Sequence, residues 1–251
     1  MNIIIASDFH LKFTPDKESS ERMKRVLKFL ASLEGKTDIL ILNGDIFDLW
    51  FSWKKVIIKE YFPVYKILAD LNESGCRIVF VAGNHDIWFG DFLKKFLNIE
   101  IYQNHFAEKI DGKKIFVTHG DLFTRNDIRY KIFRTLVRNK LIMKLFSFLH
   151  PDFALRLGEK LSRSSRFRKI PLKLRKIKES GLDNFAEKKL EEYDIVVLGH
   201  SHFPKIINFE NGIYANCGDW VSHNSYIKIN NGKVELCDFE QKTFPRNGDG
   251  K

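Results

Sequence analysis

Short, continuously apolar runs alternate along the chain with longer stretches in which apolar residues recur every three or four positions. The short runs predict buried β-strands at residues 3–7, 38–43, 77–82, 114–118 and 195–198. Between the first three runs, residues 20–33 and 60–74 have the length and spacing of helices in βαβ units. The pattern therefore predicts an α/β fold.

Beyond residue 204 the pattern changes to that of β-hairpins. Asn-Gly pairs at residues 211–212 and 231–232 lie between strand-like runs, and this dipeptide favours the tight turns that join antiparallel strands. We expect these hairpins to form a second, largely antiparallel sheet that packs on the first.

Residues 125–189 interrupt the α/β pattern. From Asp127 onward apolar residues recur at helical spacing with Arg and Lys between them, as amphipathic helices require. The apolar positions are Ile128, Ile132, Phe133, Leu136, Val137, Leu141, Leu145 and Phe146. We expect this helix to break at His150, Pro151 to open a second helix, and Pro171 and Gly181 to punctuate the rest of the segment. The predicted organisation is a core of residues 1–124 and 190–245, a helical cap inserted at 125–189, and a polar tail at 246–251.

The formal net charge of +10 comes from this predicted insertion. Residues 125–189 contain 19 Lys and Arg against 6 Asp and Glu, whereas the rest of the chain is slightly acidic. The segment is either a set of solvated helix faces or a surface that meets phosphates, anionic lipid or nucleic acid. Nucleic acid is the least favoured partner, because the cations alternate with apolar residues at core spacing and no exposed stacking platform is evident.

Cysteine usage and hydropathy favour a cytoplasmic protein. Cys76, Cys217 and Cys237 are widely separated and odd in number, which predicts neither a disulfide framework nor a Cys-x-x-Cys metal site. The first residues lack the features of a secretory signal. The longest mostly apolar stretch, near residues 141–149, is too short to span a bilayer and contains Lys144.

A short polar cluster accompanies the end of each of the five predicted strands. The clusters are SDFH at 7–10, NGDIFD at 43–48, GNHD at 83–86, THGD at 118–121 and GHSH at 199–202. One such cluster alone is commonly a cap or a hydrogen-bonded loop. Because ligand sites of α/β sheets gather at the carboxyl ends of strands, all five together predict one shared site.

The side chains of these clusters are typical of a metal centre. The candidate ligands are two carboxylates, one amide and four imidazoles: Asp8, His10, Asp45, Asn84, His119, His200 and His202. This set favours Mn²⁺, Fe²⁺ or Zn²⁺ over Ca²⁺ or a structural zinc. Seven ligands exceed the need of one ion, whereas two ions bridged by Asp45 fit the count and suit phosphoryl transfer. Residues i and i+2 of an extended segment point the same way, so we expect His200 and His202 to face one ion each, with Gly199 allowing close approach of the backbone.

As an ordered set, the motifs D-x-H, G-D-x-x-D, G-N-H-D, H-G-D and G-H-x-H resemble the calcineurin-like metallophosphoesterase superfamily. The resemblance implies a four-layer α/β fold in which helices flank two mixed β-sheets, here with an inserted helical cap. It also implies which side chains share an ion. Asp8, His10 and His202 would hold one ion and Asn84, His119 and His200 the other, with Asp45 bridging.

A narrower resemblance concerns the UDP-2,3-diacylglucosamine pyrophosphohydrolases of lipid A synthesis. It rests on GDIFDLWF at 44–51, HGDLFTRNDIRYKIFR at 119–134, the basic insertion and GDW at 218–220. It implies two divalent ions, usually Mn²⁺, that serve to cleave a nucleotide-activated glycolipid to UMP and lipid X (2,3-diacylglucosamine 1-phosphate). It also implies a cap that holds the acyl chains. Because the insertion combines an apolar face with many cations, it could also rest on an anionic membrane, and we expect a peripheral position on the cytoplasmic face of the inner membrane.

The same resemblance implies substrate contacts in the insertion. These are Asp127, Ser165, Arg168 and Lys169. Asp127 could equally be a helix N-cap. The cations of the cap, Arg163 and Arg166 included, could equally be solvated.

His85 stands where the best-known members of that group have Arg. We expect Asp48, three residues beyond Asp45, to orient His85 as a general acid or as an electrostatic partner of the leaving oxygen. Asn84 would help to stabilise charge on the phosphoryl oxygens. Three alternatives stay open: another phosphodiester or a phosphomonoester as substrate, a nucleic-acid phosphodiesterase, and a scaffold protein, against which the complete ligand set argues.

Overall fold

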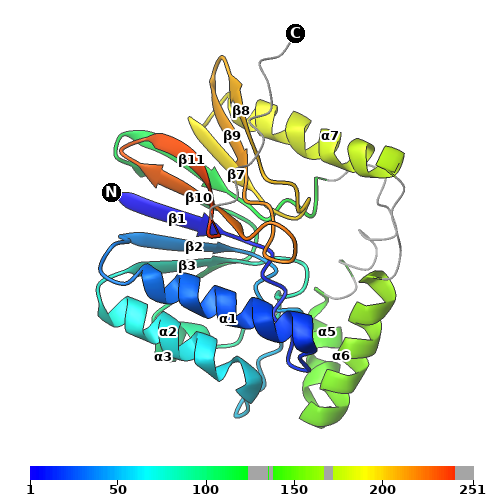
Figure 1. Ribbon diagram of the computed structural model, residues 1–251. Helices are drawn as coiled ribbons and strands as arrows, with labels where there is room; N and C mark the ends of the chain where they lie inside the picture. Colours follow the sequence, from blue (N-terminus) through cyan, green and yellow to red (C-terminus); the bar gives the residue numbers. More distant parts are fainter. Residues whose placement is uncertain (124–134, 136–137, 167–171, 241–251) are drawn as a thin grey trace.

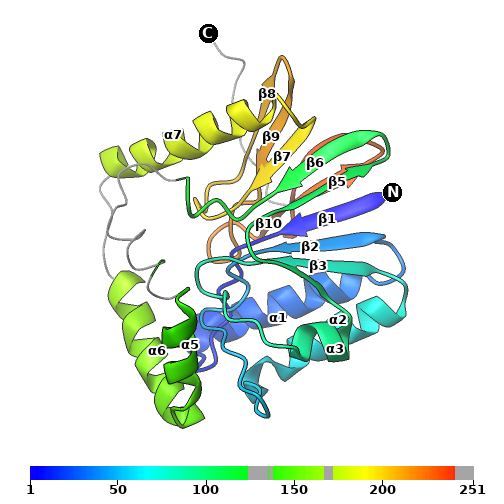
Figure 2. The same cartoon turned by 180° about the vertical axis from the view of Figure 1, so that it is seen from behind.

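The computed structural model describes residues 1–123, 135, 138–166 and 172–240, and its centre is a pair of mixed β-sheets (Figures 1 and 2). The first sheet contains β1 (Asn2–Ala6), β2 (Ile39–Asn43), β3 (Arg77–Val81), β4 (Glu100–Tyr102), β10 (Ser225–Asn230) and β11 (Lys233–Asp238), in the spatial order β11-β10-β1-β2-β3-β4. The second contains β5 (Phe106–Ile110), β6 (Lys113–Val117), β7 (Ile195–Leu198), β8 (Lys205–Phe209) and β9 (Gly212–Asn216), in the order β5-β6-β7-β9-β8. The five predicted strands are confirmed as β1, β2, β3, β6 and β7.

Both predicted hairpins form, but the sheet expected from them does not. The turn at 211–212 joins β8 to β9, and β9 pairs in parallel with β7. The turn at 231–232 joins β10 to β11, and β10 pairs antiparallel with β1. Each hairpin therefore extends a different sheet, where it satisfies the hydrogen-bonding groups of a strand that would otherwise be an exposed edge.

The two sheets pack face to face through an aliphatic core. Ile3 and Ile5 of β1 point into this core, together with Val117 of β6 and Val197 of β7. The alternate residue Ile4 points to the opposite face, where helices cover it. Burial on both faces explains why these strands are continuously apolar rather than alternating.

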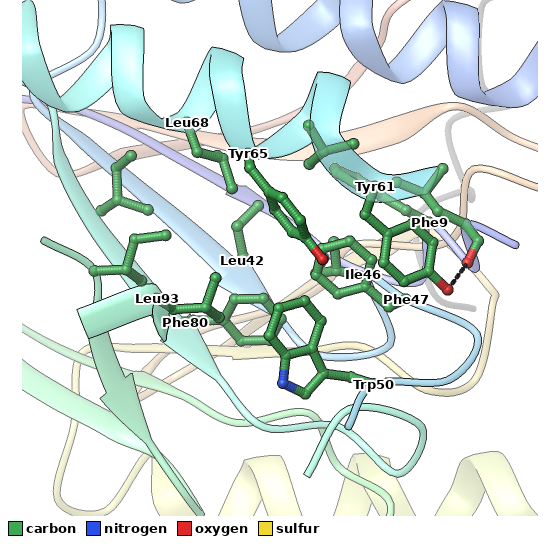
Figure 3. Packing of buried hydrophobic residues seen from close by; sticks show 14 of the residues in the cluster. Phe9, Leu42, Ile46, Phe47, Trp50, Tyr61, Tyr65, Leu68, Phe80 and Leu93 are labelled. Atoms are coloured by element: carbon green, nitrogen blue, oxygen red, sulfur yellow. Dashed lines mark hydrogen bonds between the residues drawn. The ribbon is translucent and has the colours of Figure 1, made fainter. Parts of the chain in front are cut away.

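Three helices cover the outer face of the first sheet: α1 (Lys17–Ser32), α2 (Phe62–Glu73), which follows the short 3₁₀ helix η1 (Lys59–Tyr61), and α3 (Phe92–Leu97). Figure 3 shows the rings of Tyr61 and Tyr65 beside α2, packed with Phe47 and Trp50. The Tyr61 hydroxyl donates to the carbonyl oxygens of Leu11 at 3.0 Å and Leu49 at 3.2 Å. This packing ties together the two loops that carry His10 and Asp48.

Helix α7 (Leu172–Lys189) covers the outer face of the second sheet and completes the four layers (Figures 1 and 2). The predicted break at Gly181 is wrong, because α7 runs through this residue. Glycine costs a helix roughly 1 kcal/mol relative to alanine. The apolar contacts of buried Leu182 and Ala186 with the second sheet offset that cost.

Helices α5 (Lys140–Ser147) and α6 (Pro151–Arg166) lie at the end of the molecule toward which β1, β2 and β3 point (Figures 1 and 2). Pro151 opens α6 as predicted. The prediction of a single amphipathic helix that runs up to His150 is wrong, because a helix begins anew after Asn139, whose backbone is extended. The Asn139 side chain accepts a hydrogen bond from the Leu141 backbone N–H at 2.8 Å and so caps α5. Among the described residues no helix is long and apolar enough to cross a membrane. The division into core, cap and tail stays a prediction.

Candidate metal centre

The polar clusters that follow β1, β2, β3, β6 and β7 meet at one place, although these strands belong to two sheets. Main-chain hydrogen bonds join the loops directly. The Asp8 N–H donates to the Gly44 carbonyl at 3.0 Å, and the Gly199 N–H donates to the His119 carbonyl at 3.0 Å. The structure thus brings together all seven candidate ligands in two neighbouring groups.

Asp8, His10 and His202 form the first group. Asp8 Oδ1 lies 3.2 Å from His202 Nε2 and 3.7 Å from His10 Nε2, and the two Nε2 atoms are 3.3 Å apart. Three atoms bound to one cation at about 2.1 Å lie about 3.0 to 3.4 Å from one another. The triangle therefore fits a divalent cation with little adjustment.

Asp45, His119 and His200 form the second group, and Asn84 joins it. His119 Nε2 lies 3.4 Å from Asp45 Oδ2 and 3.3 Å from Asn84 Oδ1. A ring nitrogen of His200 lies within 4.8 Å of the ligand atoms of Asp45 and His119. The two groups have the composition that the superfamily resemblance implies.

The two oxygens of Asp45 have different environments. Oδ1 accepts hydrogen bonds from the backbone N–H groups of Asn84 at 2.8 Å and His85 at 2.9 Å. Oδ2 faces both groups, at 3.4 Å from His119 Nε2 and 3.9 Å from His10 Nε2. This geometry suits a single oxygen atom shared between two cations.

Five of the seven candidate ligands have left-handed backbone conformations, with φ of 56° at Asp8, 46° at His10, 54° at Asp45, 64° at His200 and 60° at His202. The extended segment expected at 200–202 is therefore wrong. The two histidines face different groups because each lies in this sparsely populated region, and the Ser201 N–H closes a tight turn onto the Gly199 carbonyl at 2.7 Å. Strained backbone of this kind persists where the surrounding structure enforces it, commonly at functional sites.

Glycine is required where the loops cross. A Cβ atom on Gly199 would lie 2.7 Å from Ser7 Oγ and 2.9 Å from Asp8 Oδ2, which confirms the expected close approach. A Cβ atom on Gly83 would collide with the Oδ1 and N atoms of Asp45. A side chain at either position would displace a candidate ligand.

Hydrogen bonds at Nδ1 fix the orientation of the imidazoles. His119 Nδ1 donates to the Asn43 carbonyl at 2.9 Å, and His202 Nδ1 lies 2.9 Å from Asp219 Oδ2. His10 Nδ1 lies 3.5 Å from Asp48 Oδ1. With the proton on Nδ1, each ring presents the lone pair of Nε2 to the centre, as a metal ligand requires.

His85 lies beside both groups. Its Nδ1 donates to the main-chain carbonyl of Asp48 at 2.9 Å, and its Nε2 lies 3.9 Å from Asp45 Oδ2. Asp48 therefore holds His85, as expected, but through its backbone, and its carboxylate reaches His10. His10, Asp48 and His85 also lie close enough together to be considered as ligands. The bond from His85 Nδ1 leaves its Nε2 facing the centre.

Burial and neighbouring charges shift the pKa values of the centre. Burial alone would raise the pKa of Asp8 and Asp45, but nearby histidines hold both well below the usual range, so both carboxylates are ionised. Burial lowers the pKa of His200 to about 4. For His10 and His202, burial alone would lower the pKa, but the neighbouring carboxylates raise it by more. The pKa of His10 therefore rises to about 8 and that of His202 to about 10. A cation must displace protons from these two imidazoles, so its affinity falls as the pH drops below about 10, and falls more steeply below about 8.

Two residues with clear roles in the geometry were not assigned from the sequence. Asp86 is fully buried and accepts hydrogen bonds from the backbone N–H groups of Gly83, Asp45, Ile46 and Phe47, so one carboxylate joins the loops after β2 and β3. Asp219 contacts His202. Asp86 belongs to the motif GNHD and Asp219 to the motif GDW. Their place in these motifs was the sequence signal that could have identified them.

The predicted substrate contacts are not placed by the structure. Asp127, Arg168 and Lys169 lie outside the described residues. Ser165 belongs to α6, and its side chain also lies outside the described part. These assignments stay predictions.

Comparisons with known proteins find a family, and individual relatives, to which this chain is similar. The model of the calcineurin-like phosphoesterase family matches residues 1–204. A UDP-2,3-diacylglucosamine hydrolase of Porphyromonas gingivalis is 28% identical over 242 residues, covering 89% of this chain and 92% of the relative. The enzyme of the same name from Neisseria meningitidis serogroup A is 27% identical over 229 residues, covering 89% and 90%. Yfce, a phosphoesterase from E. coli of known structure, has a TM-score of 0.48 and 17% identity, covering 97% and 96%.

Proposed function

Because the chain belongs to the calcineurin-like phosphoesterase family, we propose that its centre cleaves the pyrophosphate bond of UDP-2,3-diacylglucosamine to UMP and 2,3-diacylglucosamine 1-phosphate. The chain is a hydrolase of phosphoester or pyrophosphate bonds. The observation that carries the proposal is the pair of ligand groups sharing Asp45 Oδ2, in a chain whose relatives named for this substrate match it over most of its length.

Two divalent cations, for which we propose Mn²⁺, would supply Lewis acidity and an activated water when bound. Asp8, Asp45 and the imidazoles would hold them. His85 is placed to meet an oxygen of the reacting phosphate, because its Nδ1 is engaged by Asp48 and its Nε2 faces the centre. Asn84 Oδ1 lies on the His119 side, which leaves its amide N–H₂ as a donor to a phosphoryl oxygen.

The surface of α5 and α6 supports a lipid-linked substrate. One side of α5 packs on the loops near the centre. The ring centroid of Phe146 lies 4.9 Å from that of Phe51 and 5.0 Å from that of Trp88. The two helices and their connection also expose a set of large apolar side chains that we call the outer apolar face: Leu141, Leu145, Phe148, Phe153 and Leu157. Leu145 is 60% exposed and Phe148 75% exposed. Exposed lysines and arginines lie among them: Lys140, Lys144, Arg156 and Lys160.

Apolar side chains flanked by cations are the pattern with which helices rest on an anionic bilayer. We therefore propose that the outer apolar face binds the cytoplasmic surface of the inner membrane. Leu145→Asp and Phe148→Asp should each reduce cosedimentation with vesicles that contain an anionic phospholipid. Phe96→Asp, on the similarly exposed Phe96 of α3, is the matched control and should cosediment like the wild type. Equal cosedimentation of all four proteins would exclude this face as the contact.

The substrate is tested by incubating the purified protein with Mn²⁺ and UDP-2,3-diacylglucosamine. We expect UMP to be released, and release to stop when a chelator removes the metal and to return when Mn²⁺ is restored. Hydrolysis of aryl phosphates without release of UMP would favour a different phosphoester substrate. Hydrolysis of DNA alone would favour a nuclease.

A further inference from the structure

Asp219 lies three residues beyond β9, in a loop that is attached to the metal centre. The N–H of the next residue, Trp220, donates to the main-chain carbonyl of Asp8 at 3.1 Å. Asp219 itself is buried, at 3% exposure. The loop thus holds a buried carboxylate beside the first ligand group.

The two oxygens of this carboxylate have separate partners. Oδ1 accepts from the backbone N–H groups of Ser222 at 2.9 Å and His223 at 3.1 Å, and lies 3.1 Å from His223 Nδ1. Oδ2 lies 2.9 Å from Nδ1 of His202. Three donors therefore fix Oδ1 in place, and Oδ2 is left for the candidate ligand.

His202 depends on such a contact more than His119 does. The side chain of His119 is 1% exposed, and its Nδ1 is held by a main-chain carbonyl. The side chain of His202 is 35% exposed and follows a turn with strained backbone, so packing alone fixes its ring less firmly. Without a carboxylate at Nδ1, the ring could rotate or carry its proton on Nε2.

We propose that Asp219 is a positioning residue that keeps the proton of His202 on Nδ1 and directs Nε2 to the cation shared with Asp8 and His10. Ser222 and His223 in turn fix the carboxylate. The inference rests on the metal-dependent function proposed above and adds to it a residue that acts through a ligand. Partners of this kind typically contribute about 10- to 100-fold to metal affinity.

Asp219→Asn separates this role from a structural one. The amide oxygen of Asn must take the place of Oδ1, because the Ser222 and His223 N–H groups are donors. The NH₂ group of Asn must then face His202 Nδ1, so that two donors, NH₂ and Nδ1–H, oppose each other. His202 can avoid this conflict only by moving its proton to Nε2, and Nε2 can then no longer bind the cation. Asp219→Ala removes the cap of the 219–223 turn but leaves Nδ1 free to donate to water.

The two variants should therefore rank in one order by their affinity for Mn²⁺ and in the opposite order by their thermal stability. In calorimetric titrations of metal-free protein with Mn²⁺, Asp219→Asn should weaken one of two binding events by about 10- to 100-fold, and Asp219→Ala should weaken it less. In thermal unfolding, Asp219→Ala should be the less stable of the two. Asp194→Asn, which alters an exposed carboxylate bonded to the Lys114 N–H, is the control and should bind Mn²⁺ like the wild type.

A second measurement observes the ring directly. In Zn²⁺-loaded, ¹⁵N-labelled protein, His202 should show a proton on Nδ1 and a coordinated Nε2, and this pattern should be lost in Asp219→Asn. Wild-type Mn²⁺ affinity and an unchanged His202 spectrum in Asp219→Asn would overturn the inference. Neither measurement uses the lipid substrate, so absence of UMP release with these effects intact would refute the substrate alone.

Discussion

Asp45→Asn is expected to lower kcat for UMP release by more than about a thousandfold, which corresponds to about 4 kcal/mol of lost transition-state stabilisation. The backbone N–H groups of Asn84 and His85 will keep the amide oxygen in the place of Oδ1. The NH₂ group then replaces Oδ2, so a donor points at the position where both cations need an anionic oxygen. Steady-state kinetics and metal analysis of the dialysed protein measure the two consequences, lost turnover and lower metal content.

Asp38→Asn is the matched control for this variant. Asp38 immediately precedes the amino end of β2, whereas Asp45 follows the carboxyl end, and its exposed carboxylate accepts a hydrogen bond from the Asn2 N–H at 2.6 Å. We expect this variant to keep wild-type turnover and metal content. If Asp45→Asn retained both as well, the shared-oxygen geometry would have no role in the reaction.

His85→Ala is expected to reduce kcat by about 10²- to 10⁴-fold, the range for loss of a general acid or base. Its metal content should not change, because His85 belongs to neither of the two groups that meet at Asp45 Oδ2 and its Nδ1 is engaged by the Asp48 carbonyl. The combination of impaired turnover and full metal content distinguishes a group that meets substrate from a ligand.

The control for the imidazole is His105→Ala, which removes an exposed histidine that stacks on Phe116 and belongs to none of the candidate ligand groups. It should leave kcat unchanged. A loss of bound metal in His85→Ala would instead assign His85 to the ligand set with His10 and Asp48, and would contradict its proposed contact with substrate.

The strands that carry the centre were predictable because their environment is uniform. In β1, Ile3 and Ile5 face the second sheet while Ile4 faces the helices, so every position is apolar and the run is unmistakable. The ligands were predictable because each follows such a run directly. The short, partly exposed strand β4 and the small helix α3 lack these signals and were not predicted.

Other features depend on contacts between distant parts of the chain, which local sequence does not encode. The pairing of β10 with β1 joins segments more than two hundred residues apart, so the allocation of the hairpins to separate sheets was out of reach. The left-handed backbone of His200 and His202 is imposed by the loops around them, because a residue other than glycine seldom adopts it without such support. The contact between Asp219 and His202 likewise exists only in the folded chain.

The centre lies on the seam between the two sheets, and each ligand group draws from both sides of it. Asp8 and His10 follow a strand of the first sheet while His202 follows a strand of the second, and the other group divides in the same way. Each cation would therefore link the two sheets, so that the stability of the folded chain rises with the fraction of sites that hold a cation. Without the ions the folded chain would lose this stabilisation, so a larger fraction of it would be unfolded and open to proteolysis.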